Sequence, residues 1–202
     1  MEISDTEDLV THTEIQEQNS ETPAKKETVT ILMTTLNEID GLKALLHRIK
    51  PEWFDEMIVV DGGSADGTVE FLKENNVKVI PEERKGVVNA YNQGFKNSMG
   101  DIFVIFMPDG NCIPELIPEL LQEIRNGNDI VFASRYLPPA KSYDDTVITG
   151  FGNWMFRHII NILFRCNCTD PLGGFRAYRR TAIKRMKLDT QPEENFLRRK
   201  FD

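Results

Sequence analysis

Hydrophobic and polar positions follow two alternating patterns along most of this chain. Short apolar runs rich in β-branched residues predict buried strands at residues 29–34, 56–60, 77–80, 102–107 and 129–133. Between these runs, apolar residues recur at helical spacing and predict helices at residues 39–50, 66–75, 86–98 and 114–125. Strands that alternate with helices are typical of an α/β fold, here a doubly wound, mostly parallel sheet with helices on both faces.

The two ends of the chain differ from this patterned middle. Residues 1–28 carry eight acidic and two basic side chains and few large apolar ones, so we expect a disordered acidic tail. The regular pattern predicts one globular domain at residues 29–190. Residues 191–202 contain a basic Arg-Arg-Lys run near their end, and we expect this extension to be truncated, because the sequence stops within the pattern.

One further helix is predicted by an apolar stripe over residues 147–165. Its Trp154 stands near Arg157 and Arg165, a combination typical of helices that lie in a membrane interface. A helix packed against the sheet would show the same stripe, so both interpretations stay open. No apolar run in the chain approaches the roughly 18–20 residues of a membrane span.

Charge is unevenly distributed along the chain, whose net charge is -8. Residues 174–202 carry a net charge of +5 and residues 29–173 a net charge of -7. An acidic body argues against a nucleic-acid-binding protein, whereas the basic segment can form a local site for phosphate groups. Three cysteines, an odd number, and an acidic N-terminus without an apolar leader predict a cytoplasmic location.

Polar clusters follow four of the predicted strands, at residues 35–38, 61–64, 109–111 and 134–136. The carboxyl ends of parallel strands meet at one edge of a sheet, where α/β proteins bind their ligands. In the third cluster, Asp109 and Asn111 offer a carboxylate and an amide oxygen, which suit a Mg²⁺ or Mn²⁺ that also holds a diphosphate. A turn in which Asp109 only caps backbone groups is the alternative.

The order and spacing of these motifs resemble those of the family 2 glycosyltransferases. The resemblance extends over residues 29–187 and rests on the segments 34–38, 59–68, 85–94 and 107–111. Residues 133–136 and 170–179 are similar to those of the polyprenyl-phosphate sugar transferases, the branch typified by dolichyl-phosphate mannosyltransferase. The resemblance implies a GT-A fold, which is a Rossmann-like nucleotide-binding domain.

The resemblance also implies a role for each candidate residue of the donor site. Asn37 and Glu38 would border the base and ribose of a nucleotide, Asp61 would accept hydrogen bonds from the base edge, and Thr35 and Gly86 would line the same pocket. A helix N-cap formed by Asn37 or Glu38 explains those two residues equally well.

Two positions depart from the family pattern. Gly62 stands where many relatives have a second Asp, which leaves the identity of the base open. Met107 replaces the first Asp of the Asp-x-Asp motif, so the expected metal would depend on Asp109, assisted by Asn111. One carboxylate, one amide oxygen, waters and two phosphates form a reasonable ligand set for a divalent cation.

The remaining candidates concern phosphates and the acceptor. Arg135 and Arg176 would bind phosphate groups, since a planar guanidinium pairs with two oxygens at once, and together with Asp109 they are the catalytic candidates. Asp170 would align the acceptor or stabilise its loop.

The function that follows from the resemblance is inverting transfer of a sugar from a nucleotide-diphosphate sugar to a polyprenyl phosphate, with peripheral contact to the cytoplasmic face of a membrane. An acceptor phosphate is mainly ionised near neutral pH and needs no general base. Two alternatives stay open. The chain could be a family 2 transferase acting on a saccharide hydroxyl, or a non-catalytic fragment that binds nucleotide sugars.

Overall fold

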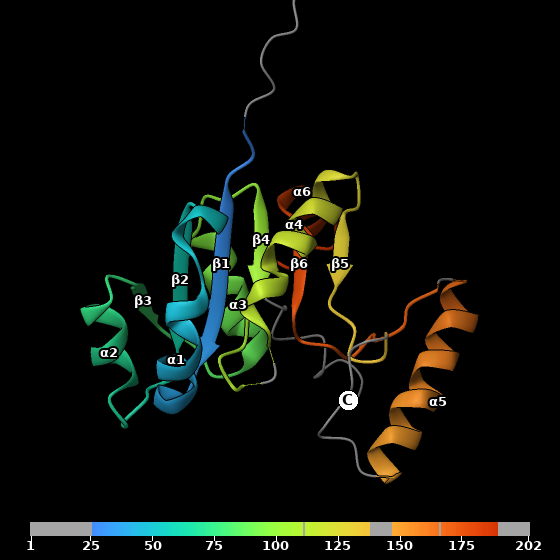
Figure 1. The fold of residues 1–202 in the computed structure, drawn as a ribbon, viewed down its shortest axis with the longest axis horizontal. Coiled ribbons are helices and arrows are strands. Elements are labelled where there is room, and N and C mark those ends of the chain that lie inside the picture. The colour runs from blue at the N-terminus through green and yellow to red at the C-terminus, as the bar shows by residue number, and fades with distance from the viewer. Residues whose placement is uncertain (1–25, 111, 138–146, 166, 190–202) are drawn as a thin grey trace, which may run out of the picture.

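Six strands form one mixed sheet in a computed structural model that describes residues 26–110, 112–137, 147–165 and 167–189. The strand order is β3-β2-β1-β4-β6-β5 (Figure 1). The strands are β1 (Val29–Thr35), β2 (Glu56–Asp61), β3 (Lys78–Pro81), β4 (Ile102–Ile105), β5 (Ile130–Phe132) and β6 (Arg176–Arg179). The five predicted strands are confirmed. The expected acidic tail, apart from residues 26–28, and the expected C-terminal extension lie outside the described residues.

Strand β6 is the strand that the sequence pattern did not predict. It pairs antiparallel with β4 on one side and with β5 on the other, whereas β1, β2, β3 and β4 pair in parallel. Only its two central residues, Ala177 and Tyr178, are buried, and an arginine stands at each end. Two apolar positions are too few to distinguish a strand from a loop by periodicity.

Five of the helices follow the predicted positions, with shorter boundaries, whereas the sixth, at Arg180–Arg185, was not predicted. They are α1 (Ile39–Leu45), α2 (Thr68–Glu74), α3 (Val87–Lys96), α4 (Ile117–Arg125), α5 (Val147–Phe164) and α6 (Arg180–Arg185), with 3₁₀ turns at Leu46–Arg48, Pro51–Trp53 and Pro114–Leu116. The first helix was predicted to reach residue 50. Lys50 instead has extended backbone angles, φ -81° and ψ 138°, because proline at position 51 disfavours a helical residue before it.

Two apolar clusters cover the two faces of the sheet. Helices α1, α2 and α4 bury their apolar sides against one face, where Ile31, Met33 and Val104 have essentially no exposed surface. Helices α3 and α6 cover the other face, together with Leu32 and Phe103. Because successive residues of β1 enter opposite clusters, the central strand has no solvated face, as its continuous apolar sequence predicts.

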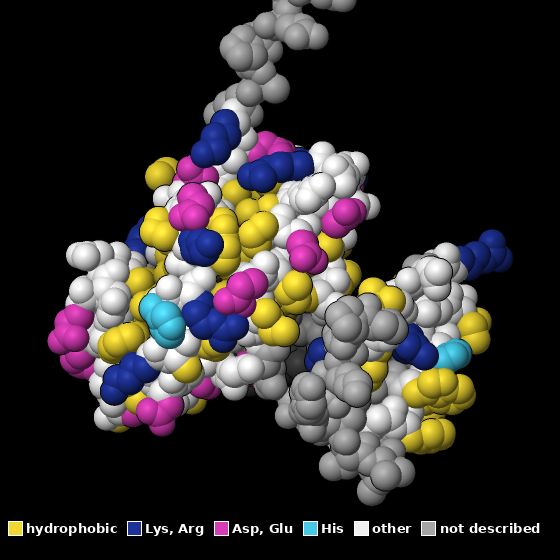
Figure 2. All heavy atoms as spheres, in the orientation of Figure 1, with side chains coloured by type: hydrophobic (Ala, Val, Ile, Leu, Met, Phe, Trp, Pro, Cys, Tyr) yellow, Lys and Arg dark blue, Asp and Glu magenta, His cyan; other side chains and the backbone are white. Residues whose placement is uncertain are grey.

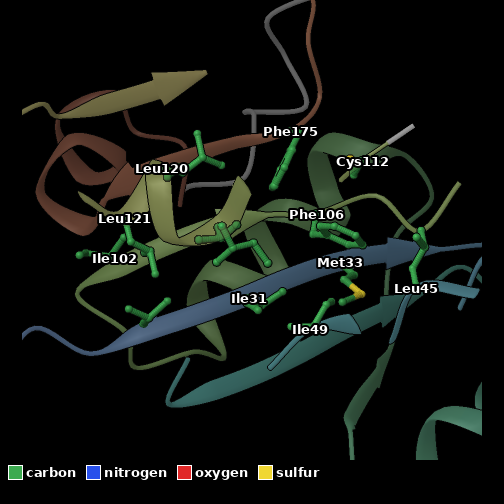
Figure 3. Close-up of a cluster of buried hydrophobic side chains, with 14 of the residues drawn as sticks. Ile31, Met33, Leu45, Ile49, Ile102, Phe106, Cys112, Leu120, Leu121 and Phe175 are labelled. Atoms are coloured by element: carbon green, nitrogen blue, oxygen red, sulfur yellow. The ribbon is translucent and has the colours of Figure 1, made fainter. Parts of the chain in front are cut away.

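Phe106 connects the end of β4 to the segment that leads into β6. Its ring meets that of Phe175 edge to face, with centroids 5.6 Å apart, and both side chains lie in the first cluster near Met33 and Cys112 (Figure 3). This contact holds the antiparallel strand beside the end of β4, which is the edge where the candidate residues lie.

Helix α5 lies apart from the sheet (Figure 1). Most of its large apolar side chains are exposed, and Ile162, Leu163 and Phe164 each retain at least 70% of their accessible surface. None of the helices in the described ranges combines the length and the apolar character that crossing a membrane requires. Figure 2 shows hydrophobic side chains gathered over this helix.

Replacing Phe106 with Ala is expected to lower the free energy of unfolding by about 3–5 kcal/mol, since the change leaves a cavity against Phe175. Urea denaturation measures this loss. Phe156→Ala is the matched control, because Phe156 is 47% exposed on α5 and its truncation should cost no more than about 0.5 kcal/mol. Equal losses in both variants would contradict the described core.

Candidate functional site

A cavity of about 380 Å³ opens at the carboxyl ends of β1, β2, β3 and β4. Four of the predicted site residues line it: Thr35, Glu38, Gly86 and Asp109. Apolar side chains from β2, α3 and the end of β4, including Val60, Ala90 and Met107, form part of its wall. The structure therefore brings residues of the first, second and third polar clusters together, as the sheet topology predicts.

Asp61 lies behind this cavity and is nearly buried. Its Oδ2 accepts hydrogen bonds from the backbone N–H groups of Gly63 (2.8 Å) and Ser64 (2.9 Å), and its Oδ1 accepts from Thr35 Oγ1 (3.0 Å) and Ser64 Oγ (2.5 Å). Burial alone would raise the pKa of Asp61, but these hydrogen bonds outweigh it and hold the pKa below its ordinary value. Asp61 thus joins β1 to the loop after β2.

Asn37 also connects these two loops. It has a left-handed backbone conformation (φ 58°), its N–H donates to Ser64 Oγ, and its Oδ1 accepts from the N–H of Ala65 (2.8 Å). The alternative in which Asn37 or Glu38 caps α1 is wrong. The N–H groups at the start of α1 donate instead to Asp66 Oδ2 and Thr68 Oγ1 from the neighbouring loop, and no side chain within α1 forms its cap.

Asp109 is positioned by a close backbone approach. A Cβ atom at Gly41 would lie 1.7 Å from the carbonyl oxygen of Pro108, so only glycine lets α1 approach the loop that carries Asp109. Glu38 lies near enough to be influenced by that carboxylate. Burial raises the pKa of Glu38, and the negative charges of Asp109 and Asp66 raise it further. A cation bound between Glu38 and Asp109 would relieve this repulsion.

Met107 is the residue at which the resemblance implied the loss of a metal-binding carboxylate. A Cβ atom at Gly174 would lie 2.0 Å from Met107 Cε, which shows that the thioether packs directly on the backbone before β6. Within the described residues, no group of three or more acidic, histidine or cysteine side chains could hold a metal ion. Asn111, the second predicted metal ligand, lies outside those residues.

The turn after β3 contributes residues that the sequence reasoning missed. Glu82 and Lys85 line the cavity, and Lys85 Nζ donates a hydrogen bond to the carbonyl oxygen of Gly62. The signal was available, because these residues follow a predicted strand, as the other polar clusters do.

Arg135 and Asp170 form a bidentate ion pair beyond β5. Arg135 Nε donates to Asp170 Oδ2 (2.8 Å), its Nη2 donates to Oδ1 (3.1 Å), and its backbone N–H also reaches Oδ2 (3.1 Å). Asp170 is 1% exposed. Its burial alone would raise its pKa, but the hydrogen bonds and the charge of Arg135 hold the pKa below its ordinary value of 3.8. Asp170 therefore stabilises this loop and orients the guanidinium.

Arg176 lies at a different cavity from Asp109. That cavity, of about 290 Å³, is lined by α3 side chains and shares Val87 with the first. Arg176 Nη1 donates to Tyr178 Oη (3.2 Å), and its guanidinium lies 5.6 Å from the ring centroid of Phe132. The structure thus divides the predicted phosphate-binding residues between two places on one sheet edge.

Comparison with known proteins identifies the family. The family model of glycosyl transferase family 2 matches residues 30–187, so this chain belongs to that family. It is 33% identical to a dolichol-phosphate mannosyltransferase of Pyrococcus furiosus over 80% of its own length and 49% of the relative's. It is 31% identical to an undecaprenyl-phosphate mannosyltransferase of Micrococcus luteus over 80% of its length and 70% of the relative's. The chain therefore spans about half of the first relative.

The fold also matches solved structures. The glucosyl-3-phosphoglycerate synthase of Mycobacterium tuberculosis, in complex with Mn²⁺, uridine diphosphate and glucosyl-3-phosphoglycerate, superposes with a TM-score of 0.63 at 23% identity. The match covers 77% of this chain and 58% of that one. The predicted GT-A fold is therefore confirmed.

Replacing Asp170 with Asn should lower the free energy of unfolding at pH 7 by about 1–3 kcal/mol, a loss limited by the partial exposure of Arg135. Because its pKa is lowered in the folded state, Asp170 stabilises the protein above its ordinary pKa of 3.8. The difference between the two proteins should therefore shrink as pH falls below about 4. Urea denaturation of both proteins at a series of pH values measures this difference in the free energy of unfolding.

Asp129→Asn is the control for this prediction, since Asp129 pairs with Arg185 at an exposed position. Its effect should stay within about 0.5 kcal/mol. A difference between wild type and Asp170→Asn that does not change with pH would contradict the ionised pair.

Proposed function

We propose that this protein transfers a sugar from a nucleotide-diphosphate sugar to a polyprenyl phosphate. The observation that carries the proposal is the cavity at the sheet edge with Asp109 at its wall, in a chain that resembles transferases of this acceptor class. An oxygen of the acceptor phosphate attacks the anomeric carbon as the bond to the leaving diphosphate breaks. Attack from the face opposite the leaving group inverts the configuration.

A divalent cation, Mg²⁺ or Mn²⁺, fits the donor set only as a partner of the nucleotide. Asp109 would hold it, with Glu38 near enough to share its charge, and Met107 contributes no oxygen. Mg²⁺ is commonly bound through one or two carboxylates together with substrate phosphates and waters. When bound, the cation would supply positive charge to stabilise the leaving diphosphate.

The acceptor phosphate needs cationic side chains rather than a general base, because its second ionisation is largely complete near neutral pH. Arg135, oriented by Asp170, and Arg176, beside the neighbouring cavity, are the two candidates that the described edge offers. Each lies on the β5–β6 side of Asp109 in the sheet order. We therefore assign the acceptor to that side and the nucleotide to the β1–β3 side.

Helix α5 supports contact with a membrane surface. It exposes Phe151, Trp154, Ile162, Leu163 and Phe164, together with a partly exposed Arg157. Aromatic and aliphatic side chains near arginine are typical of helices that lie in a lipid interface. Such contact would place the protein peripherally at the membrane that contains its acceptor.

One observation favours a second function. Met107 replaces a carboxylate of the metal motif and packs against Gly174. A protein with this change could bind a nucleotide sugar without transferring the sugar. Transfer to a saccharide hydroxyl has less support, because such an acceptor needs a positioned base.

Replacing Asp109 with Ala is expected to abolish the metal dependence of nucleotide binding. In the wild type, Mn²⁺ should strengthen binding of uridine or guanosine diphosphate by about tenfold, since the cation joins the carboxylate to the phosphates. Titration calorimetry with and without Mn²⁺ measures this. Asp40→Ala, an exposed carboxylate outside the cavity, is the control.

Metal-independent binding in both wild type and Asp109→Ala would overturn the metal assignment. The acceptor is tested by incubating wild-type protein with a panel of nucleotide sugars and polyprenyl phosphate and identifying the lipid product by mass. Nucleotide binding without any product would favour the binding function.

Replacing Ile162 with Asp should weaken binding to lipid vesicles several-fold, because it places a charge on the exposed apolar side of α5. Co-sedimentation with vesicles of phosphatidylcholine and phosphatidylserine measures this. Met99→Asp introduces the same charge at an 83% exposed residue outside α5 and should have little effect. Equal binding by all three proteins would contradict the role of α5.

A further inference from the structure

The donor cavity has a carboxylate at each end. Asp109 follows β4, and Glu82 directly follows Pro81, the last residue of β3. In the strand order β3-β2-β1-β4, these positions are separated by three strand spacings, or about 14 Å. If the diphosphate is held at Asp109, the base of the nucleotide therefore lies toward Glu82.

The Glu82 carboxylate is almost completely buried, with 8% of its side chain exposed. Its Oε1 accepts a hydrogen bond from the N–H of Gly86 (2.8 Å). Its Oε2 forms an ion pair with the ammonium of Lys85 at 3.7 Å, a separation too long for a hydrogen bond. A nearly buried carboxylate oxygen that accepts no hydrogen bond within the described residues is stabilised by a ligand that donates one.

Gly62 leaves the space in front of this oxygen open. A Cβ atom at Gly62 would lie 3.5 Å from Glu82 Oε2 and 3.5 Å from Leu36 Cδ1. A longer side chain at this position would occupy the space between them. Leu36 is 56% exposed, so it presents an apolar surface beside the carboxylate and the ammonium of Lys85. A flat ring with polar edge groups matches this arrangement.

The turn that carries Glu82 is held in place from α3. Gln93, which is nearly buried, donates from Nε2 to the carbonyl oxygen of Pro81 (2.9 Å), and its Oε1 accepts from the N–H of Glu83 (3.1 Å). Gly86 ends the turn with φ +120°, a conformation essentially reserved for glycine. Glu82 is thus presented to the cavity on an ordered backbone.

We propose that Glu82 and Lys85 read the nucleobase of the donor. Glu82 Oε2 accepts a ring N–H, and Lys85 Nζ donates to the carbonyl oxygen next to it. This pairing selects uracil and guanine, which have an N–H beside a carbonyl, over adenine and cytosine, which have a ring nitrogen acceptor beside an amino group. The inference rests on the proposed function, because it takes a nucleoside diphosphate as the ligand.

Glu82→Gln tests this assignment with little change of shape. The N–H of Gly86 requires an acceptor, so the oxygen of the new side-chain amide would face Gly86 and its NH₂ group would face the cavity. An NH₂ group repels a ring N–H but can donate to a ring nitrogen. Glu83→Gln is the matched control, because Glu83 is an exposed neighbour outside the cavity and loses the same charge.

Calorimetry with the full chain and Mn²⁺ would compare the diphosphates of uridine, guanosine, adenosine and cytidine. In wild type and Glu83→Gln, the uridine or guanosine compound should bind best. Glu82→Gln should weaken that binding by about tenfold to a hundredfold. Its affinity for adenosine and cytidine diphosphate should stay within about twofold of the wild-type affinity. Diphosphates of 3-methyluridine and 1-methylguanosine, which lack the ring N–H, should bind wild type about tenfold more weakly than their parents.

The outcomes separate the two proposals. If no nucleotide binds to wild type, the proposed function itself fails. If nucleotides bind but Glu82→Gln keeps the wild-type order and the wild-type discrimination against the methylated bases, base reading by Glu82 is overturned while the proposed function stands. Thermal denaturation of Glu82→Gln close to that of wild type would show that the turn remains folded.

Discussion

Strand β1 pairs with a neighbour on each side and is covered on both faces, and the position of the donor cavity follows from its register. Thr35 lies opposite Asp61 on β2, and Leu32 lies opposite Ile105 on β4. This register places the loops that follow β1, β2 and β4 side by side at one edge of the sheet. A slip of one residue would turn the side chains of β1 to the opposite faces and separate those loops.

The loops themselves are joined by side chains that satisfy backbone groups across the strand ends. Asp61 and Asn37 connect the loops after β1 and β2, and Asp66 supplies the N-terminal hydrogen bond of α1. Asn37, Asp61 and Asp66 lie near the cavity but are not among the residues that line it. Their hydrogen bonds hold the surrounding backbone, and the charged groups of the cavity wall come from Glu38, Glu82, Lys85 and Asp109.

The edge of the sheet separates two kinds of chemistry. On the β1–β3 side, carboxylates and an ammonium line a cavity suited to a nucleotide. On the β5–β6 side, Arg135 and Arg176 present guanidinium groups, one held by a buried carboxylate and one beside a mainly apolar cavity. Met107 and Gly174 lie in contact between the two sides.

The sequence by itself determined five of the strands, the helices between them and the edge at which the polar clusters meet, because periodicity of apolar residues is a local property. It also identified the family through short motifs at strand ends. Strand β6 was not predicted, since its pairing depends on β4 and β5, which lie far away in the chain.

The tertiary structure alone decided which polar residues face the cavity. Asp61 and Asp109 stand in similar strand-end motifs, yet Asp61 is saturated by hydrogen bonds behind the wall, whereas Asp109 lines the cavity. Glu82 belongs to no distinctive motif, and its position beside Gly62 at the cavity depends on how β2 and β3 pair. Burial and hydrogen-bond partners of such groups depend on residues distant in sequence, which no local pattern specifies.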